Sequence, residues 1–417
     1  MTALTARPGN ALTGIAAIPG DKSCSHRALI LGAMATGETV ITNLSTAEDV
    51  TRTMRAVEAF GAMVEQVGER WRVRGAAWRT PDAPIDCGNS GTTARLLIGA
   101  VAGMAGVSST FVGDASLSAR PMRRMIVPLT RMGARIEGGD TLPLTVHGAK
   151  LGGVDFTNVP ASAQVKSAIL LAGISGFSQV RITEPVASRD HTEIMLGEFG
   201  YAAEDKRPLS ACDITIGADP SAAAFALTAA ATIPGSSVTV RDMLVNPLRT
   251  GLYEVLEEMG AAVELSNERI VSGEIFADVT IGHGRLQGVT VPAERIPAMI
   301  DEIPALAVAA AMADGETVIH GLAELRVKES DRLGATLAGL IACGVTALAD
   351  GDSLRIFGRG AARGGSVLAH GDHRIAMAFL TLGLAADGPV SVDDGTMIAT
   401  SFPDFIDSMR ALGADIG

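Results

Sequence analysis

The sequence has 417 residues, of which 47% are hydrophobic and 19% are charged, and its formal net charge at pH 7 is −12. This length predicts two domains of roughly 200 residues each. The acidic balance and the scarcity of aromatic residues argue against nucleic-acid binding, which needs a basic surface. The four cysteines form no CxxC pair, and neither a signal peptide nor an 18-residue apolar run is evident. We therefore expect a reduced cytoplasmic protein that does not enter a membrane.

The predicted elements repeat six times along the chain. Each copy has a strand, then a polar loop, then an amphipathic helix that ends at a glycine, where a left-handed conformation closes the helix. The strands are expected in 38–45, 109–117, 179–185, 237–244, 316–322 and 389–395. The closing glycines are Gly61, Gly133, Gly200, Gly260, Gly344 and Gly413.

A second helix, apolar on nearly all sides, precedes each of these strands. These helices are expected in 25–37, 90–103, 162–176, 220–235, 300–315 and 372–388. A helix that is apolar all round belongs inside a domain. Six units with a midpoint near Asp219 predict an α/β fold with two lobes of three units each, in which sheets surround buried helices.

Polar and basic residues recur where these helices begin, for example at Lys22–Arg27, Asn89–Thr93, Ser162–Lys166 and Asp372–Arg374. Helix N-termini carry unpaired N–H groups and the positive end of the dipole, so they attract anions. Basic residues are normally disfavoured there, and a local rule broken at equivalent places indicates function. The pattern predicts a cleft that holds more than one phosphate or carboxylate.

Six stretches carry a resemblance to the EPSP synthase family, and they occur in the family's order between about Pro19 and Phe405. They are PGDKSCSHRAL, GNSGTTARLL, GDASLSARPMRRM, ASAQVKSAILLAG, RVKESDRL and HGDHRIAM. The resemblance implies two inside-out α/β lobes of three βαβαββ units, 20–218 and 1–19 with 219–417, with an interdomain active-site cleft. It also implies transfer of the enolpyruvyl group of phosphoenolpyruvate to the 5-hydroxyl of shikimate 3-phosphate. Neither metal nor cofactor is expected, and we expect a monomer.

The resemblance also assigns roles to individual residues. Asp301 would accept the 5-hydroxyl proton, Glu329 would move protons at C3 of the enolpyruvyl group, and Lys22 would protonate the departing phosphate. Ser23, here taken as a capping residue, would bind shikimate 3-phosphate. The remaining substrate-binding residues would be Arg27, Gly91, Arg120, Ser162, Ala163, Gln164, Arg189, Lys328, Arg332 and Arg374. Arginine suits this task because its planar fork grips a carboxylate or phosphate through two parallel hydrogen bonds.

SRDHTE, SAQVK and GDKS resemble the glyphosate-tolerant class II branch of the family, whereas Gly91 and Leu248 depart from its pattern. Two other functions stay open: enolpyruvyl transfer to UDP-N-acetylglucosamine, and anion binding without catalysis. The first enzyme carries a reactive cysteine in the loop that reads GDASLSARPMRR here, and the second would lose Asp301 or Glu329. GIAAIPGDKS fails the strict P-loop spacing. The HxxH pair His370 and His373 has no evident third ligand, so we interpret it as site architecture rather than a zinc pair.

Overall fold

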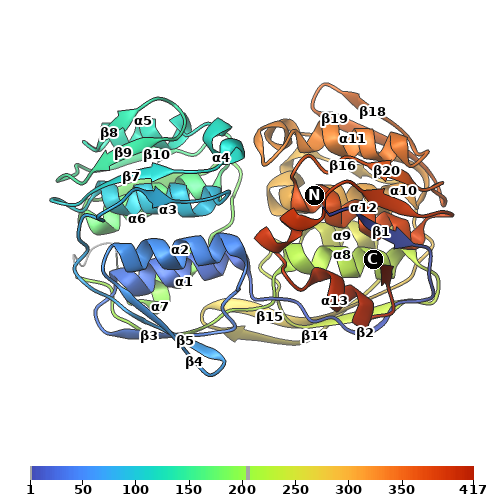
Figure 1. Cartoon of the computed structure of the whole chain (residues 1–417), viewed down its shortest axis with the longest axis horizontal. Coiled ribbons are helices and arrows are strands. Elements are labelled where there is room, and N and C mark those ends of the chain that lie inside the picture. Colours follow the sequence, from blue (N-terminus) through green and yellow to red (C-terminus); the bar gives the residue numbers. More distant parts are fainter. Residues whose placement is uncertain (1, 203–206) are drawn as a thin grey trace. The chain divides into compact units, whose positions relative to one another are not determined.

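The computed structural model describes residues 2–202 and 207–417 and has a mixed α/β fold. The chain divides into two compact units, and Figure 1 draws each in colours that follow the sequence. The N-terminal unit comprises Gly20–Ile216 and Val271–Glu274. The C-terminal unit comprises Met1–Pro19, Gly217–Ile270 and Ile275–Gly417. Within the described part of the chain, no helix is long and apolar enough to cross a membrane.

The N-terminal unit contains three described sheets. Two have four strands each, in the orders β12-β3-β5-β4 and β6-β7-β9-β8, and the third is the parallel pair β10 and β11. In both four-stranded sheets the first edge strand is parallel to its neighbour, and the other pairings are antiparallel. The strands are β3 (Glu38–Thr42), β4 (Met63–Val67), β5 (Arg70–Arg74), β6 (Ile85–Asp86), β7 (Ser108–Val112), β8 (Arg135–Gly138), β9 (Leu144–His147), β10 (Val154–Thr157), β11 (Val180–Thr183) and β12 (Asp213–Thr215).

The C-terminal unit repeats the same sheet three times. The strand orders are β14-β15-β13-β2, β16-β17-β19-β18 and β20-β21-β1-β22, and β2, β16 and β20 are again parallel edge strands. The recurrence of one sheet pattern agrees with the repeat predicted from the sequence. The strands are β1 (Leu4–Arg7), β2 (Thr13–Ile15), β13 (Ser237–Leu244), β14 (Ala262–Val271), β15 (Glu274–Gly282), β16 (Thr290–Val291), β17 (Asp314–Ile319), β18 (Thr346–Asp350), β19 (Ser353–Arg359), β20 (Gly365–Val367), β21 (Val390–Val392) and β22 (Asp415–Ile416).

The six helices predicted to be apolar on all sides are all present and are largely buried. In α8 and α10 every residue is buried, because alanine-rich helices present no polar face that needs water. Figure 1 shows α1 and α3 lying between the sheet of β3–β5 and the sheet of β7–β9. Their bounds are α1 (Lys22–Met34), α3 (Gly91–Ala102), α6 (Ala163–Ser175), α8 (Pro220–Thr232), α10 (Ile303–Ala311) and α12 (His373–Ala385).

The second set of helices follows the strands, as predicted. The six expected closing glycines all have positive φ angles, from 71° at Gly200 to 112° at Gly61, so the predicted left-handed turns are confirmed. The other helices are α2 (Glu48–Ala59), α4 (Ala115–Ala119), α5 (Arg123–Arg131), α7 (His191–Glu198), α9 (Gly251–Met259), α11 (Arg332–Ala342) and α13 (Phe405–Ala411), with the 3-10 turns η1 (Ala293–Ala298), η2 (Ile300–Glu302), η3 (Ala323–Val327) and η4 (Thr396–Thr400).

A glycine sets the distance between two of the buried helices. An added Cβ at Gly99 of α3 would lie 2.2 Å from the backbone oxygen of Ala168 in α6. Any side chain there would force the helices apart, so the glycine permits a backbone-to-backbone contact. This close packing brings the first turns of α3 and α6 together, and several predicted site residues lie in those turns.

One detail of the predicted helix starts is wrong. Asp21, not Ser23, caps α1: its carboxylate accepts the Cys24 N–H at 2.7 Å, because Ser23 already lies inside the helix. Arg120 ends the short helix α4, with φ −77° and ψ 137°. Pro121 follows it, and the residue before a proline is driven out of the helical region.

Candidate active site

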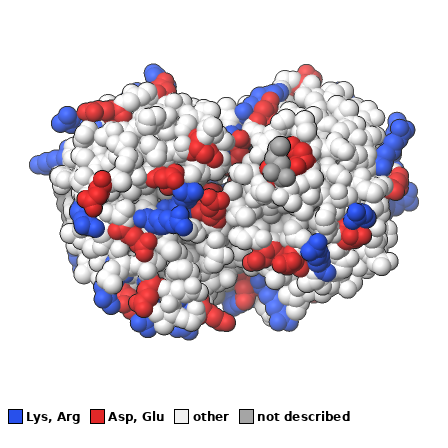
Figure 2. All heavy atoms as spheres, in the orientation of Figure 1, with Lys and Arg blue, Asp and Glu red and all other residues white. Residues whose placement is uncertain are grey.

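Buried cations are the clearest indication of a site. In the described residues the buried basic side chains are Arg27, Arg120, Lys166, Arg249, Arg332 and Arg374. Lysine and arginine are rarely buried without a pairing role, and four of these six were predicted to bind substrate. Figure 2 shows, by contrast, that acidic and basic residues are interspersed on the visible surface.

Lys22 is the first residue of α1, and its ammonium contacts a carboxylate from the next helix. Its Nζ lies 2.8 Å from Oδ2 of Asp49 in α2, and both side chains are mostly buried, with exposures of 14% and 11%. The ion pair fixes the start of α1 against α2. It also restrains an otherwise flexible four-carbon side chain.

Arg27 lies one turn further along α1 and joins three elements of the N-terminal unit. Its Nε donates to Thr192 of α7 at 2.7 Å and its Nη2 donates to Ser167 of α6 at 2.7 Å. Its Nη1 donates to the backbone oxygen of Ser23 at 2.9 Å. Burial and the nearby positive charge of Arg189 lower the pKa of the guanidinium, while Cys24, Glu193 and Asp21 oppose that shift. A second cation near a buried one predicts an affinity for anions.

The first turns of α3 and α6 share a hydrogen-bonded chain. Arg95 donates to Gln164 Oε1 at 2.7 Å, and Gln164 Nε2 donates to Thr92 Oγ1 at 2.9 Å. Gly91 opens α3 beside this chain, with Ser90 as the N-cap. An added Cβ at Gly91 would lie 2.7 Å from Nη1 of Arg95 and 3.4 Å from Nη1 of Arg120. The absence of a side chain at Gly91 therefore leaves room for two guanidinium groups.

The other predicted residues of the N-terminal unit lie at helix ends or in loops between helices and strands. Arg120 is buried and its Nη2 donates to Asn89 Oδ1 at 2.5 Å and to Ser116 Oγ at 3.2 Å. Ser162 is the N-cap of α6, which begins at Ala163. Arg189 lies in the loop between β11 and α7.

The predicted residues of the C-terminal unit form one charged cluster around Arg332, which is fully buried. Its guanidinium contacts Asp301 at 3.3 Å, Glu329 at 2.5 Å and Asp372 at 2.8 Å. Burial opposes the charge, but Asp372, Glu329 and Asp301 outweigh it and raise the pKa of Arg332. The carboxylate of Asp301 therefore lies next to a guanidinium that stays charged at every relevant pH.

Two further cations approach Asp301. Lys328 Nζ lies 3.4 Å from Asp301 Oδ1, and Arg374 Nη1 donates to the backbone oxygen of Asp301 at 3.0 Å. Arg374 lies in the first turn of α12, whose N-cap is Asp372. The cluster thus combines three carboxylates with three cations, so its formal charges balance before an anion arrives.

Asp301 and Glu302 immediately precede the buried helix α10. Asp301 lies in the 3-10 turn η2 before α10, and Glu302, which is the N-cap, makes no side-chain capping bond. Glu302 instead accepts a hydrogen bond from Ser221 of α8. Neither carboxylate is therefore used to cap α10.

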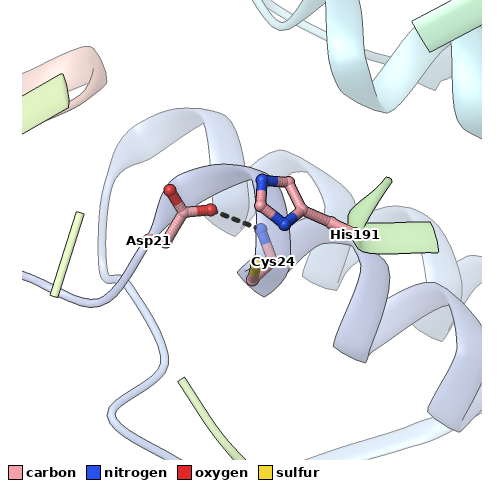
Figure 3. Close-up of side chains that lie close together, drawn as sticks. All are labelled: Asp21, Cys24 and His191. Atoms are coloured by element: carbon pink, nitrogen blue, oxygen red, sulfur yellow. Dashed lines mark hydrogen bonds between the residues drawn. The ribbon is translucent and has the colours of Figure 1, made fainter. Parts of the chain in front are cut away.

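One group of side chains has the composition of a metal site. Ligand atoms of Asp21, Cys24 and His191 lie within 4.8 Å of one another, and all three residues are buried. Figure 3 shows these three side chains close together. Asp21 is engaged as the cap of α1, and Nδ1 of His191 lies 2.6 Å from the Glu274 carboxylate. The first bond caps α1 and the second joins the start of α7 to β15, and we derive no reaction step through a metal there. His373, of the HxxH pair, contacts Thr400 through Nδ1 at 3.1 Å.

Several partners of the predicted residues were missed from the sequence. Asp49, Arg95, Glu184 and Asp372 all hold predicted residues or their neighbours in place. Arg95 and Asp372 lie inside the quoted motifs, so proximity to the motif was an available signal. Asp49 and Glu184 lie outside every motif, and only the fold brings them near.

The fold is that of the enolpyruvyl transferases. EPSP synthase from Acinetobacter baumannii matches with a TM-score of 0.86 and 38% identity, covering 100% of both chains. The enolpyruvyl transferase NikO from Streptomyces tendae, at 20% identity, matches in fold with a TM-score of 0.78 over 100% of this chain and 98% of that one.

Sequence comparison defines the family. The model of EPSP synthase (3-phosphoshikimate 1-carboxyvinyltransferase) matches residues 6–409. The 3-phosphoshikimate 1-carboxyvinyltransferase of Caulobacter vibrioides is 49% identical, and the alignment covers 100% of this chain and 99% of that protein. The protein of the same name from Afipia carboxidovorans is 52% identical, with coverage of 99% and 98%. The chain belongs to the EPSP synthase family and is a transferase.

Proposed function

We propose that the chain transfers the enolpyruvyl group of phosphoenolpyruvate to the 5-hydroxyl of shikimate 3-phosphate and releases phosphate. Membership of the family gives the reaction. The observation within the structure that supports it best is the cluster in which Asp301 and Glu329 share the buried guanidinium of Arg332. The reaction needs two proton-moving groups next to cations that stabilise a departing phosphate.

The proposed sequence of steps balances its protons. The 5-hydroxyl oxygen attacks C2 of phosphoenolpyruvate and gives its proton to Asp301, while C3 gains a proton through Glu329. The tetrahedral intermediate then loses phosphate, which Lys22 protonates, and C3 loses a proton back to Glu329. Asp301 releases its proton to solvent and Lys22 takes one up, so both groups return to their starting states. Lys22 is restrained by Asp49 at 2.8 Å, so its ammonium is positioned before an anion arrives. Removing mobility in advance lowers the entropy cost of the step.

The buried cations of both units would neutralise the two substrates. In the N-terminal unit, Arg27 and Arg189 form a pair of like charges that a phosphate would relieve. In the C-terminal unit, Arg374 and Arg332 lie at helix starts, where the dipole also favours anions. We assign Arg120, Arg332, Arg374 and the backbone at Gly91 to phosphoenolpyruvate, Lys22 and Lys328 to the substrates generally, and Ser23, Arg27, Ser162, Ala163, Gln164 and Arg189 to shikimate 3-phosphate.

We also propose that residues 20–218 form one functional lobe and residues 1–19 with 219–417 the other, and that both lobes contribute to one reaction. A cytoplasmic monomer is the state we propose for the enzyme. The four cysteines support a reducing compartment, since all are free thiols and three of them are buried. Light scattering coupled to size-exclusion chromatography would measure the mass directly, and a value near twice 42.8 kDa would contradict the monomer.

The experiment that tests the function compares two acceptors. Phosphate release is measured with phosphoenolpyruvate and shikimate 3-phosphate, and separately with UDP-N-acetylglucosamine as the acceptor. We expect release with shikimate 3-phosphate only, and none with phosphoenolpyruvate alone. Turnover with the sugar nucleotide, or with neither acceptor, would contradict the proposal.

A further inference from the structure

Lys166 is the one buried lysine in the described part of the chain, and the proposed reaction does not use it. It lies in α6, and its side chain is 4% exposed. Burying an ammonium is costly unless charged or polar partners surround it. The partners of Lys166 therefore show what the residue holds in place.

The ammonium of Lys166 contacts three groups. Nζ lies 2.8 Å from Oε2 of Glu184 and 2.8 Å from Oε1 of Glu193, and it donates to the backbone oxygen of Ser188 at 3.2 Å. Glu184 and Ser188 belong to the loop between β11 and α7. Ser188 is the residue immediately before Arg189.

Glu184 extends the network in two directions. Its carboxylate accepts the Ser188 hydroxyl at 2.5 Å and Asn158 Nδ2 at 2.6 Å. Burial raises the pKa of Glu184, but hydrogen bonds from Lys166, Ser188 and Asn158 outweigh this and hold it below its ordinary value. The carboxylate is thus ionised and saturated by donors, which makes its position well determined.

Asn158 completes the connection to α6. Its Nδ2 also donates to the backbone oxygen of Ser162 at 3.1 Å, and its side chain is buried. The chain of contacts runs from Ser162, the N-cap of α6, through Asn158 and Glu184 to Ser188, beside Arg189. Lys166 lies at its centre and supplies the positive charge that the carboxylate needs.

We infer that Lys166 is a positioning residue for the shikimate 3-phosphate subsite: it holds the Ser162 and Arg189 loops at a fixed spacing and does not touch the substrate. The inference rests on the proposed function, because Ser162 and Arg189 are assigned to shikimate 3-phosphate there. Losing one hydrogen bond to a charged group lowers affinity roughly ten- to a hundredfold. Phosphoenolpyruvate, bound by other residues, should be much less affected.

The test is steady-state kinetics with each substrate varied separately. Lys166→Met should raise the KM for shikimate 3-phosphate about ten- to a hundredfold, because the phosphate loses a well-placed charged partner, while kcat and the KM for phosphoenolpyruvate change less than about threefold. Glu184→Gln should reproduce this pattern. The matched control is Glu193→Gln, which removes a carboxylate from the same ammonium but leaves the Asn158–Glu184–Ser188 contacts intact, and it should stay within about threefold of the wild type.

Lys166→Met leaves Glu184 without its main cation. If this variant does not fold, Ser188→Ala is measured in its place. Removing that hydroxyl should raise the same KM roughly three- to tenfold, and the melting temperature identifies any general loss of stability. Equal rises in both KM values, or no rise for shikimate 3-phosphate, would overturn the inference. Wild-type turnover is measured in the same assay, so failure of the proposed function is recognised separately.

Discussion

Replacing Gly91 with alanine adds one methyl group at a place where the structure defines its neighbours. Gly91 does not have a positive φ, so alanine causes no backbone strain there. The new Cβ would lie 2.7 Å from Nη1 of Arg95, whereas nonbonded atoms pack at roughly 3.5–4.0 Å. The Arg95 guanidinium must therefore move by about 1 Å. Arg120, at 3.4 Å, need move much less.

The consequence of this movement follows from what Arg95 holds. Arg95 is half-buried and flexible, so its displacement should change the free energy of unfolding by less than about 1 kcal/mol. It also holds Gln164 at 2.7 Å, and that bond would be strained or lost. Overpacking costs about 1–3 kcal/mol, which is roughly a five- to hundred-and-fiftyfold change in affinity. We expect the larger part of this effect on glyphosate, which is longer than phosphoenolpyruvate, and the smaller part on the substrate.

The assay is the inhibition constant of glyphosate and the KM of phosphoenolpyruvate, measured in parallel for the wild type and Gly91→Ala. The matched control is Gly139→Ala, where an added Cβ meets nothing within 4 Å. In an Arg95→Ala background the new methyl should lose much of its effect, because the clashing group is gone. Equal shifts for inhibitor and substrate would refute discrimination by Gly91. If Gly91→Ala changes the inhibition constant as much in the Arg95→Ala background as in the wild type, the methyl group does not act by displacing the Arg95 guanidinium.

Three further predictions concern residues with defined partners. Asp301→Asn should lower kcat roughly 10²- to 10⁴-fold while calorimetric binding of shikimate 3-phosphate stays within a fewfold, and a matching loss of affinity would make Asp301 a binding group only. Lys22→Met, which also leaves Asp49 unpaired, should lower kcat and raise both KM values in the phosphate-release assay; an unchanged kcat would argue against its catalytic role. Burial, together with the nearby charges of Lys22 and Arg27, holds the pKa of His26 well below 6.5. Below pH 6.5 the unfolded state therefore binds a proton that the native state does not. The free energy of unfolding should fall by up to about 1.4 kcal/mol for each pH unit below that value. Urea unfolding at pH 7.5 and 5.5 should show this loss, and His26→Asn should reduce it; a variant with the same slope would contradict the assignment.

The repeat made much of the fold predictable from the sequence. The burial of helices such as α8 and α10 is predictable because they lack a polar face. A helix end is predictable at a glycine such as Gly61, because glycine adopts a φ of 112° without strain and other residues do not. Both signals are local, so a single sequence is enough to detect them. The extended conformation of Arg120 is also a local effect, because Pro121 restricts the residue before it.

The partners of the site residues could not be predicted in the same way. Lys22 pairs with Asp49, 27 residues away, and Arg95 pairs with Gln164, 69 residues away. Residues so far apart in sequence are brought together by packing, for instance by the contact of Gly99 with α6. Nothing in the local sequence encodes the pairing. The resemblance supplied the residues expected to touch substrate, whereas the structure supplied the residues that hold them.

The most direct test of the proposed chemistry is to run the reaction in D₂O and examine the enolpyruvyl methylene of the product by proton NMR. If C3 is protonated during addition and loses a proton during elimination, solvent deuterium must enter that methylene. We predict a product with partly deuterated vinyl positions, and no exchange into phosphoenolpyruvate when shikimate 3-phosphate is omitted. A product formed over many turnovers with its vinyl protons fully retained would contradict the addition–elimination sequence and the role assigned to Glu329.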